Sequence, residues 1–253
     1  MTIDSAADRS PRVRILVAAH NEADRLGATL AALARAFPGA PVWVADDGSR
    51  DATAAVARSA GARVVRSERA IGKGGAVTAA AHAALRDAGA EDDAGAVFVL
   101  CDGDLTDSAG ELVALADSVA RGEADLAIAA FATRVGGGLG LALGFARWAI
   151  RARCGLQTRA PISGQRALSG AALAHVLPFA SGYGMEVGMT IDAVRAGERV
   201  VELELELSHR ASGRTPAGFL HRGRQLVDFA RVYRSRRPGR ARVHARNLAR
   251  PWT

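Results

Sequence analysis

The chain has 253 residues, of which 49% are hydrophobic and 5% are aromatic, and it carries a formal net charge of +7. This length suits one α/β domain, whose core must consist mostly of Ala, Val and Leu. Two cysteines exclude a disulfide framework and favour a cytoplasmic location. No apolar segment of the signal-peptide type opens the chain, and the longest apolar run, the 12 residues Val135 to Ala146, is too short to span a membrane.

The positive charge gathers at the C-terminal end of the chain. From Arg210 onward there are twelve arginines and one acidic residue, so the rest of the chain is mildly acidic. Such a basic segment can bind phosphate groups, an anionic membrane surface or nucleic acid. The alternative is a solvated tail without a partner. The only lysine is Lys73, which stands between two glycines. A single lysine in an arginine-rich chain indicates a local role.

Apolar runs and helical spacing alternate through the first half of the chain. This alternation predicts a mostly parallel sheet with helices on both faces, and ligands that bind outside the carboxyl ends of the strands. Strands are predicted at Val13–Ala18, Pro41–Ala45, Ala62–Val65, Ala96–Cys101 and Asp125–Phe131, and helices at Asn21–Phe37, Asp51–Ala60, Gly74–Ala88 and Ser108–Arg121.

After Phe131 this alternation breaks. A Gly-rich segment, residues 136–144, leads into an apolar and basic stretch that ends near Arg153. The remaining pattern predicts helices at Ser169–Leu177, Glu186–Arg195 and Phe219–Tyr233, and a half-exposed strand at Arg199–Leu207.

Polar and acidic residues follow three of the predicted strands. They are Ala19-His20-Asn21-Glu22, Asp46-Asp47-Gly48-Ser49 and Asp102-Gly103-Asp104. In a parallel sheet these turns converge at one edge, where carboxylates repel each other unless they bind cations or hydrogen-bond donors. The last turn can present two carboxylates to a hard cation such as Mg²⁺, and a carboxylate after the second strand can bind a nucleobase or ribose. Each Asp-Gly pair is, by itself, also a common turn.

Two glycine-rich segments resemble nucleotide-binding loops. Gly72-Lys73-Gly74-Gly75 precedes a helix, where backbone N–H groups and Lys73 can hold a diphosphate. It is not a Walker A loop, because Ser67 replaces the first glycine and Gly74 replaces the Ser or Thr. Residues 136–144 fail the dinucleotide pattern, because Leu141 and Leu143 occupy the third-glycine positions, so no nicotinamide or flavin is expected.

Taken together, these residues resemble the GT-A glycosyltransferases of family 2. The similarity is greatest to polyprenyl-phosphate mannosyl- and glucosyltransferases and to glucosyl-3-phosphoglycerate synthases. The motifs that carry it are AHNE at 19–22, DDGSRD at 46–51, GKGGA at 72–76, DGDL at 102–105, SGQRAL at 163–168, GYGMEVGMTIDA at 182–193 and HRASGR at 209–214.

The resemblance implies a GT-A (Rossmann-like) α/β fold, with a mostly parallel sheet flanked by helices and a C-terminal acceptor-side extension. The resemblance covers roughly residues 14–214 and implies a nucleotide-sugar half (13–131) and an acceptor half (132–233), to which composition adds a disordered N-terminus (1–12) and a basic tail (234–253). It implies Mg²⁺ or Mn²⁺ bound to the diphosphate of a UDP- or GDP-sugar.

The implied site residues fall into four groups. The metal would be held by Asp102, Asp104 and His209; the nucleotide-sugar by Ala19, His20, Glu22, Asp46, Asp47, Gly72, Lys73, Asp102 and Gly103; the acceptor or its phosphate by Gln165, Arg166, Arg210 and Arg214; and catalysis would use Asp104, Lys73 and Glu186. Glu186 is the candidate general base where the acceptor is a hydroxyl group and the reaction inverts configuration.

We therefore expect a metal-dependent glycosyltransferase, with polyprenyl phosphate favoured as the acceptor. That acceptor would bring peripheral contact at the inner face of the membrane, through Leu139–Arg153 and the basic tail. The alternative acceptor is a soluble phosphorylated small acid or a secondary metabolite. A catalytically inactive sugar-nucleotide-binding protein is an alternative of another class, a homodimer is left open, and the acidic strand ends argue against a nucleic-acid partner.

Overall fold

The structure is a computed structural model that describes residues 12–88, 95–131, 140–207 and 216–236, with side chains in the last range from residue 225 onward. The described residues form a seven-stranded sheet with the order β3-β2-β1-β4-β6-β5-β7. The strands are β1 (Val13–Ala19), β2 (Val42–Asp46), β3 (Arg63–Arg66), β4 (Val97–Asp102), β5 (Leu126–Phe131), β6 (Arg166–Ser169) and β7 (Val200–Leu205).

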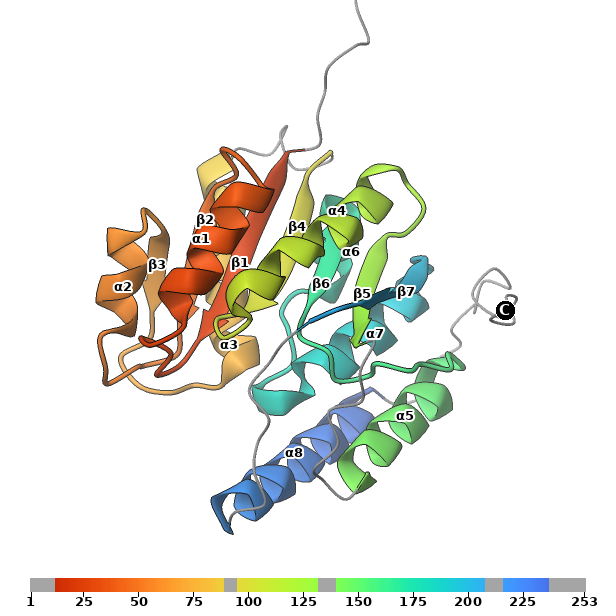
Figure 1. The fold of residues 1–253 in the computed structure, drawn as a ribbon. Coiled ribbons are helices and arrows are strands. Elements are labelled where there is room, and N and C mark those ends of the chain that lie inside the picture. Colours follow the sequence, from red (N-terminus) through yellow and green to blue (C-terminus); the bar gives the residue numbers. More distant parts are fainter. Residues whose placement is uncertain (1–11, 89–94, 132–139, 208–215, 237–253) are drawn as a thin grey trace, which may run out of the picture.

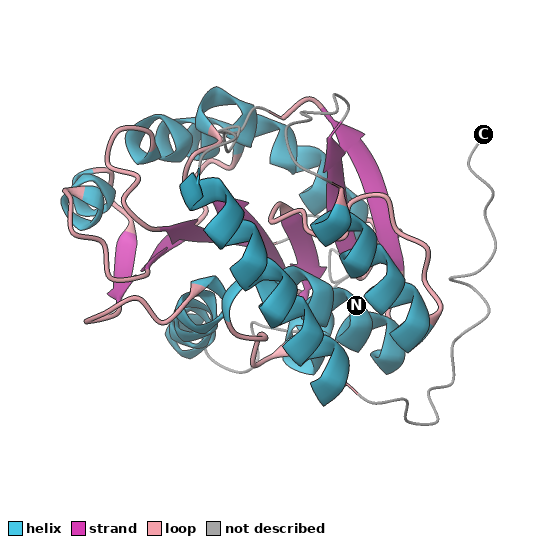
Figure 2. Cartoon of the chain, turned by 90° about the horizontal axis from the view of Figure 1, so that it is seen from below, coloured by secondary structure: helices cyan, strands magenta, loops and turns pink. Residues whose placement is uncertain are grey.

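Helices cover both faces of this sheet (Figure 1 and Figure 2). The α-helices are α1 (Leu26–Ala36), α2 (Thr53–Ser59), α3 (Lys73–Ala88), α4 (Val113–Ala120), α5 (Leu141–Cys154), α6 (Gly170–Val176), α7 (Met185–Ala196) and α8 (Pro216–Ser235), and the 3₁₀ helices are η2 (Thr106–Leu112) and η3 (Gly182–Gly184).

The sheet is mostly parallel, which confirms the expected fold class. Strands β3, β2, β1 and β4 are parallel to one another, and β7 is parallel to β5. Only β6 runs antiparallel to its neighbours β4 and β5. Because β6 and β7 come from the second half of the chain and complete the same sheet, the two expected halves share one sheet.

Strand alternation divides the core into two layers. Ile15 and Val17 of β1 point to the layer that α1 and α4 cover, whereas Leu16 points to the layer that α3, α6 and α7 cover. A third apolar cluster joins α5, α7 and α8, around Ile150 and Phe229. Figure 1 shows α5 and α8 side by side, apart from the strands. None of the helices in the described parts of the chain is long and apolar enough to cross a bilayer.

Several elements differ from the sequence-based expectation: α5 was predicted only as an apolar and basic stretch, and α1 begins at Leu26 and not at Asn21. The strand β6 was not predicted, because it has only four residues and begins with an arginine, so its motif resembled a loop. The single helix expected over Ser108–Arg121 is instead η2 followed by α4. Gly110 lies within η2, and glycine is a poor α-helix former.

Candidate functional site

Three strand ends meet at one edge of the sheet. β1 lies between β2 and β4, and the register pairs Ala19 with Asp46 and Ala18 with Asp102. Because these strands are parallel, the residues that follow them leave the sheet at the same edge. The acidic turns after β2 and β4 therefore flank the turn after β1, as the sequence predicted.

Hydrogen bonds join the turn after β1 to the turn after β2. His20 Nδ1 lies 2.7 Å from the carbonyl oxygen of Asp47, and the backbone N–H of Asn21 donates to Ser49 Oγ over 3.0 Å. A carbonyl only accepts, so Nδ1 of His20 carries a proton, and Nε2 lies 3.0 Å from Asn21 Nδ2, where it accepts. The exposed His20 is thereby fixed in one orientation at the edge of the sheet.

Ala19 and Glu22 contribute backbone contacts to the same pair of turns. Ala19 is 4% exposed, and its carbonyl oxygen accepts the N–H of Asp47 over 3.0 Å. The N–H of Glu22 donates to Thr53 Oγ1 over 2.9 Å. With its methyl group buried, Ala19 has only its backbone to offer a nucleotide.

Asp46 is fully buried at the end of β2. Its Oδ1 accepts the N–H of Ser49 over 2.9 Å, and its Oδ2 lies 3.4 Å from Arg66 Nε of β3. The contact with Arg66 is an ion pair, and Oδ2 accepts no hydrogen bond from the described residues. Asp46 thus shapes the turn and keeps one carboxylate oxygen with unused acceptor capacity.

Asp47 holds the loop that precedes α3. Its Oδ1 accepts the N–H of Ile71 over 2.6 Å, and its Oδ2 accepts the N–H of Gly72 over 2.9 Å. Gly72 has φ = 90°, in the left-handed region that favours glycine. The Asp47 carboxylate is therefore occupied by the protein itself, and any contact with a nucleotide shares it with these amides.

Lys73 joins two carboxylates that lie far apart in the sequence. Its Nζ lies 2.6 Å from Asp102 Oδ1 and 2.7 Å from Glu186 Oε1. Burial opposes the charge on Lys73, but these two carboxylates outweigh it and raise the pKa of Lys73 above its usual value. Glu186 is 6% exposed at the start of α7, whereas the Lys73 side chain is 24% exposed at the start of α3. The Lys73 ammonium group thus lies near the N-termini of α3 and α7. Helix N-termini attract anions, as the ammonium group does.

Gly164 and Gln165 pack against Asp102 from the strand side. Gln165 Nε2 donates to Asp102 Oδ2 over 2.9 Å, and Gln165 Oε1 accepts from Ser163 Oγ over 3.2 Å. A Cβ atom on Gly164 would lie 2.5 Å from both Asp102 Oδ2 and Lys73 Nζ. Only a glycine at this position leaves room for the ion pair. Gln165 is only 2% exposed. The acceptor contact that the sequence predicted for it stays a prediction.

The Gly164→Ala variant tests this crowding. The added methyl group should push Lys73 away from Asp102 and lower the free energy of unfolding by about 1 to 3 kcal/mol, the usual cost of overpacking. The matched control is Gly110→Ala, because nothing lies within 4 Å of a Cβ atom there. Chemical denaturation of both variants measures the effect, and equal stability of the two would show that the site tolerates the methyl group.

Arg166 is fully buried, which differs from the expected contact with acceptor or phosphate. Its Nε donates to the carbonyl oxygen of Ser163 over 2.8 Å, and its Nη1 donates to Thr190 Oγ1 over 2.9 Å. Burial lowers the pKa of Arg166 to about 10, against the attraction of the Glu186 and Glu202 carboxylates. In this structure the guanidinium supports protein atoms and has no surface to offer a ligand.

The turn after β4 carries the two carboxylates expected to hold a metal. The N–H of Gly103 donates to the carbonyl oxygen of Ala18 over 2.9 Å, and the carbonyl oxygen of Gly103 accepts from Thr29 Oγ1 over 2.8 Å. Both backbone groups of Gly103 are thus used to fix the turn, while Asp102 and Asp104 on either side are partly exposed.

The donor set at this turn fits a hard divalent cation. Within the described parts of the chain, no three His, Cys, Asp or Glu residues are close enough together to hold a metal by themselves. Mg²⁺ needs only one or two carboxylates when phosphate oxygens and water complete its shell, and Asp102 and Asp104 can supply these. His209, Arg210 and Arg214 lie outside the described residues.

Thr29 was missed in the sequence. It is fully buried in α1, and its Oγ1 donates to Gly103 and accepts the N–H of Thr106 over 2.8 Å. A lone threonine between Leu26, Leu30 and Leu33 was the available signal, because a buried hydroxyl needs a partner.

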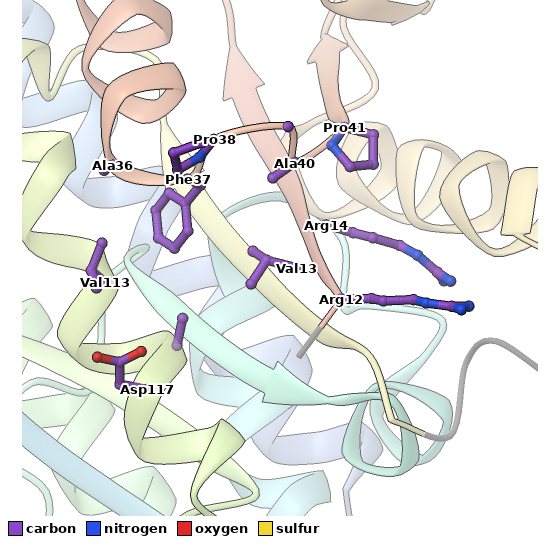
Figure 3. Close-up of a pocket in the computed structure, with 12 residues that line it drawn as sticks. Arg12, Val13, Arg14, Ala36, Phe37, Pro38, Ala40, Pro41, Val113 and Asp117 are labelled. Carbon is purple, nitrogen blue, oxygen red and sulfur yellow. The ribbon is translucent and has the colours of Figure 1, made fainter. Parts of the chain in front are cut away.

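A separate pocket lies at the opposite end of the sheet (Figure 3). It has a volume of about 460 Å³ and includes Val13 at the start of β1, Phe37 and Pro38 after α1, and Asp117 of α4. Ligands of parallel sheets bind at the carboxyl ends of the strands, whereas this pocket is at the amino ends. We therefore place the candidate site at the turns after β1, β2 and β4.

Solved structures with similar folds include several of one enzyme. Glucosyl-3-phosphoglycerate synthase from Mycobacterium tuberculosis, in complex with Mn²⁺, UDP and glucosyl-3-phosphoglycerate, is 26% identical, with a TM-score of 0.70, over 90% of this chain and 80% of that chain. Its complex with Mn²⁺, UDP-glucose and glycerol 3-phosphate is 27% identical, with a TM-score of 0.68, over the same shares of the two chains.

A comparison with curated protein sequences finds no match. The family model of glycosyl transferase family 2, however, matches residues 14–157, which is more than half of the chain. This range contains the turns after β1, β2 and β4 and the start of α3. The resemblance stated from the motifs is confirmed, and the chain belongs to glycosyl transferase family 2.

Proposed function

We propose that the chain transfers a sugar from a UDP-sugar to a small phosphorylated acceptor, with Mn²⁺ or Mg²⁺ as the cofactor. One observation carries the proposal: Lys73, Asp102 and Glu186 meet at the carboxyl edge of the sheet, at the turn that also carries Asp104, in a family 2 chain. The similar synthase has been solved with Mn²⁺ and UDP-glucose, which favours UDP over the GDP that the sequence left open.

The residues of this chain have separable tasks in the proposal. Asp102 and Asp104 would hold the metal, which when bound offsets negative charge on the diphosphate. Lys73 supplies a fixed positive charge where the leaving diphosphate develops negative charge, and such preorganised charge lowers the barrier. Glu186 holds the Lys73 ammonium group in place.

The role of Glu186 as a general base stays a prediction. Its Oε1 accepts a hydrogen bond from the Lys73 ammonium group, so a proton from an acceptor would compete with this contact at the same oxygen. A phosphate acceptor is already nucleophilic and needs no base. The two acceptor classes thus require different behaviour from the same carboxylate.

A soluble acceptor is favoured over polyprenyl phosphate. Some solved structures of the similar synthase contain glycerol 3-phosphate or phosphoglyceric acid, which are small phosphorylated molecules. The sequence favoured polyprenyl phosphate, and that acceptor, with its peripheral membrane contact, stays a prediction from the basic and apolar stretch that forms α5 and from the basic tail. The cytoplasmic location and the homodimer also stay predictions.

Thermal denaturation with a panel of nucleotides tests the donor site. A ligand that binds only the folded state raises the midpoint, by an amount that grows with its affinity. We expect UDP to raise the midpoint with Mn²⁺ present and much less without it, and GDP, CDP, dTDP and NAD to have smaller effects. A shift with NAD alone, or no shift with any nucleoside diphosphate, would contradict the proposal.

A further inference from the structure

The loop between α5 and β6 carries Gly164 and Gln165 to the site, and two charged residues hold it. These are Arg166 of β6 and Glu202 of β7, which both pair with Ile128 of β5 in the sheet register. Paired residues of neighbouring strands point to the same face of a sheet. Arg166 and Glu202 therefore lie in one row on one face, on either side of Ile128.

Glu202 binds the beginning of this loop. Its carboxylate accepts the backbone N–H groups of Arg159, over 2.8 Å, and of Ala160, over 3.0 Å, together with the hydroxyl group of Thr158. All three groups are donors, and Oε1 of Glu202 accepts from each of them, while Oε2 accepts the N–H of Arg159 as well. Two of the three contacts are with the backbone and do not depend on the side chains of the loop.

Arg166 binds the other end of the loop from inside the protein. Its Nε donates to the carbonyl oxygen of Ser163 over 2.8 Å, and its Nη2 makes a longer contact of 3.5 Å with that of Pro161. Arg166 is fully buried, and its Nη1 is anchored on Thr190 of α7. The amide groups of the loop thus face an anion, and its carbonyl groups face a cation.

We propose that Arg166 and Glu202 are positioning residues for the glycosyltransferase site: by holding the loop 158–163 they set Gln165, which orients the Asp102 carboxylate. Gln165 Nε2 contacts Asp102 Oδ2, while Lys73 contacts Oδ1 of the same carboxylate. Neither Arg166 nor Glu202 touches Asp102 in this arrangement. The inference rests on the proposed function in one respect, namely that Asp102 serves the UDP and metal site.

The test compares Glu202→Gln with Glu204→Gln. Glu204 lies two residues along β7 on the same face, with its side chain 54% exposed and one contact of 3.4 Å to Arg159. A glutamine at 202 keeps one acceptor oxygen, but it loses the negative charge and places an N–H₂ group where Oε2 accepts the N–H of Arg159 over 2.8 Å, so it should loosen the loop. Amide hydrogen exchange of the ligand-free protein should then quicken at least tenfold at Arg159 and Ala160 in Glu202→Gln, and stay at the wild-type rate in Glu204→Gln.

Calorimetry with UDP and Mn²⁺ gives the second readout. Loss of residues that orient metal ligands typically weakens metal affinity about 10- to 100-fold, and we expect a loss of that size for UDP–Mn²⁺ in Glu202→Gln. Faster exchange with unchanged UDP–Mn²⁺ affinity would overturn the inference, because the loop would then move without consequence for the site. Unchanged exchange in a folded Glu202→Gln would overturn it as well.

The Gln165→Met variant tests the contact with Asp102 independently of the contacts that hold the loop. It also provides a test of the inference if Glu202→Gln does not fold. It removes the contact with Asp102 at nearly constant volume and leaves Glu202 and Arg166 in place. UDP–Mn²⁺ affinity should fall as in Glu202→Gln, with wild-type exchange at Arg159 and Ala160. Wild-type affinity in Gln165→Met would overturn the inference.

Failure of the proposed function gives a different pattern of results. The wild type would then show no Mn²⁺-dependent UDP binding. Amide hydrogen exchange would still show whether Glu202 holds the loop 158–163. In that case, faster exchange at Gly103 in Glu202→Gln supports the positioning of the turn after β4, and unchanged exchange overturns it.

Discussion

The Lys73→Met variant is expected to lose about 3 kcal/mol of folding free energy. Removing one partner of a buried ion pair costs about 3 to 5 kcal/mol, because the remaining charge has no partner. We expect the low end of this range, since 24% of the Lys73 side chain and 33% of the Asp102 side chain are exposed. For a chain of this size, the melting temperature should fall by about 6 to 12 °C.

A double variant shows whether the unpaired carboxylate causes this loss. Combining Lys73→Met with Glu186→Gln removes the more deeply buried of the two carboxylate charges that the missing ammonium group would leave unpaired, while Asp102 keeps its charge. The double variant should regain about 1 kcal/mol relative to Lys73→Met alone. A double variant that is no more stable than the single one would argue against the ion pair. Arg86→Met, an exposed basic residue on the same helix, is the matched control for loss of positive charge.

The Asp104→Ala variant should lose Mn²⁺-dependent UDP binding with little change in stability. A metal on the diphosphate contributes several kcal/mol, so removing one of its carboxylate ligands should lower UDP affinity at saturating Mn²⁺ about 10²-fold or more. Calorimetry of UDP with and without Mn²⁺ measures the effect.

Asp107→Ala is the control for this experiment. Asp107 lies three residues further along the chain, with its side chain 88% exposed and paired with Arg35 over 3.0 Å. The Asp107→Ala variant should bind UDP and Mn²⁺ with the same affinity as the wild type. Equal UDP affinities of the Asp104→Ala and Asp107→Ala variants would mean that the turn after β4 does not hold the metal.

The strands and the acidic turns could be predicted because local sequence determines them. Five apolar runs end close to the observed ends of β1 to β5, and the acids that follow β1, β2 and β4 meet because these strands are parallel. Lys73 was recognised because it is the only lysine and stands between glycines. These signals need only neighbouring residues and the topology of a parallel sheet.

The contacts that organise the site could not be predicted from local sequence. Lys73 and Glu186 are 113 positions apart, and no local pattern indicates that they form an ion pair. Asp47 was assigned to the nucleotide, but its carboxylate is bound by the amides of residues 71 and 72. Arg166 was assigned to the acceptor because its motif resembles that of the family, but it is fully buried and its guanidinium donates to protein atoms.

Release of UDP from UDP-glucose, measured with Mn²⁺ and three acceptors, tests the central claim most directly. The acceptors are phosphoglyceric acid, glycerol 3-phosphate and a polyprenyl phosphate in lipid vesicles. We predict Mn²⁺-dependent transfer to at least one of the two soluble acceptors, and its loss in Asp104→Ala. Transfer to the polyprenyl phosphate alone, or no Mn²⁺-dependent release of UDP with any of the three, would contradict the proposed function.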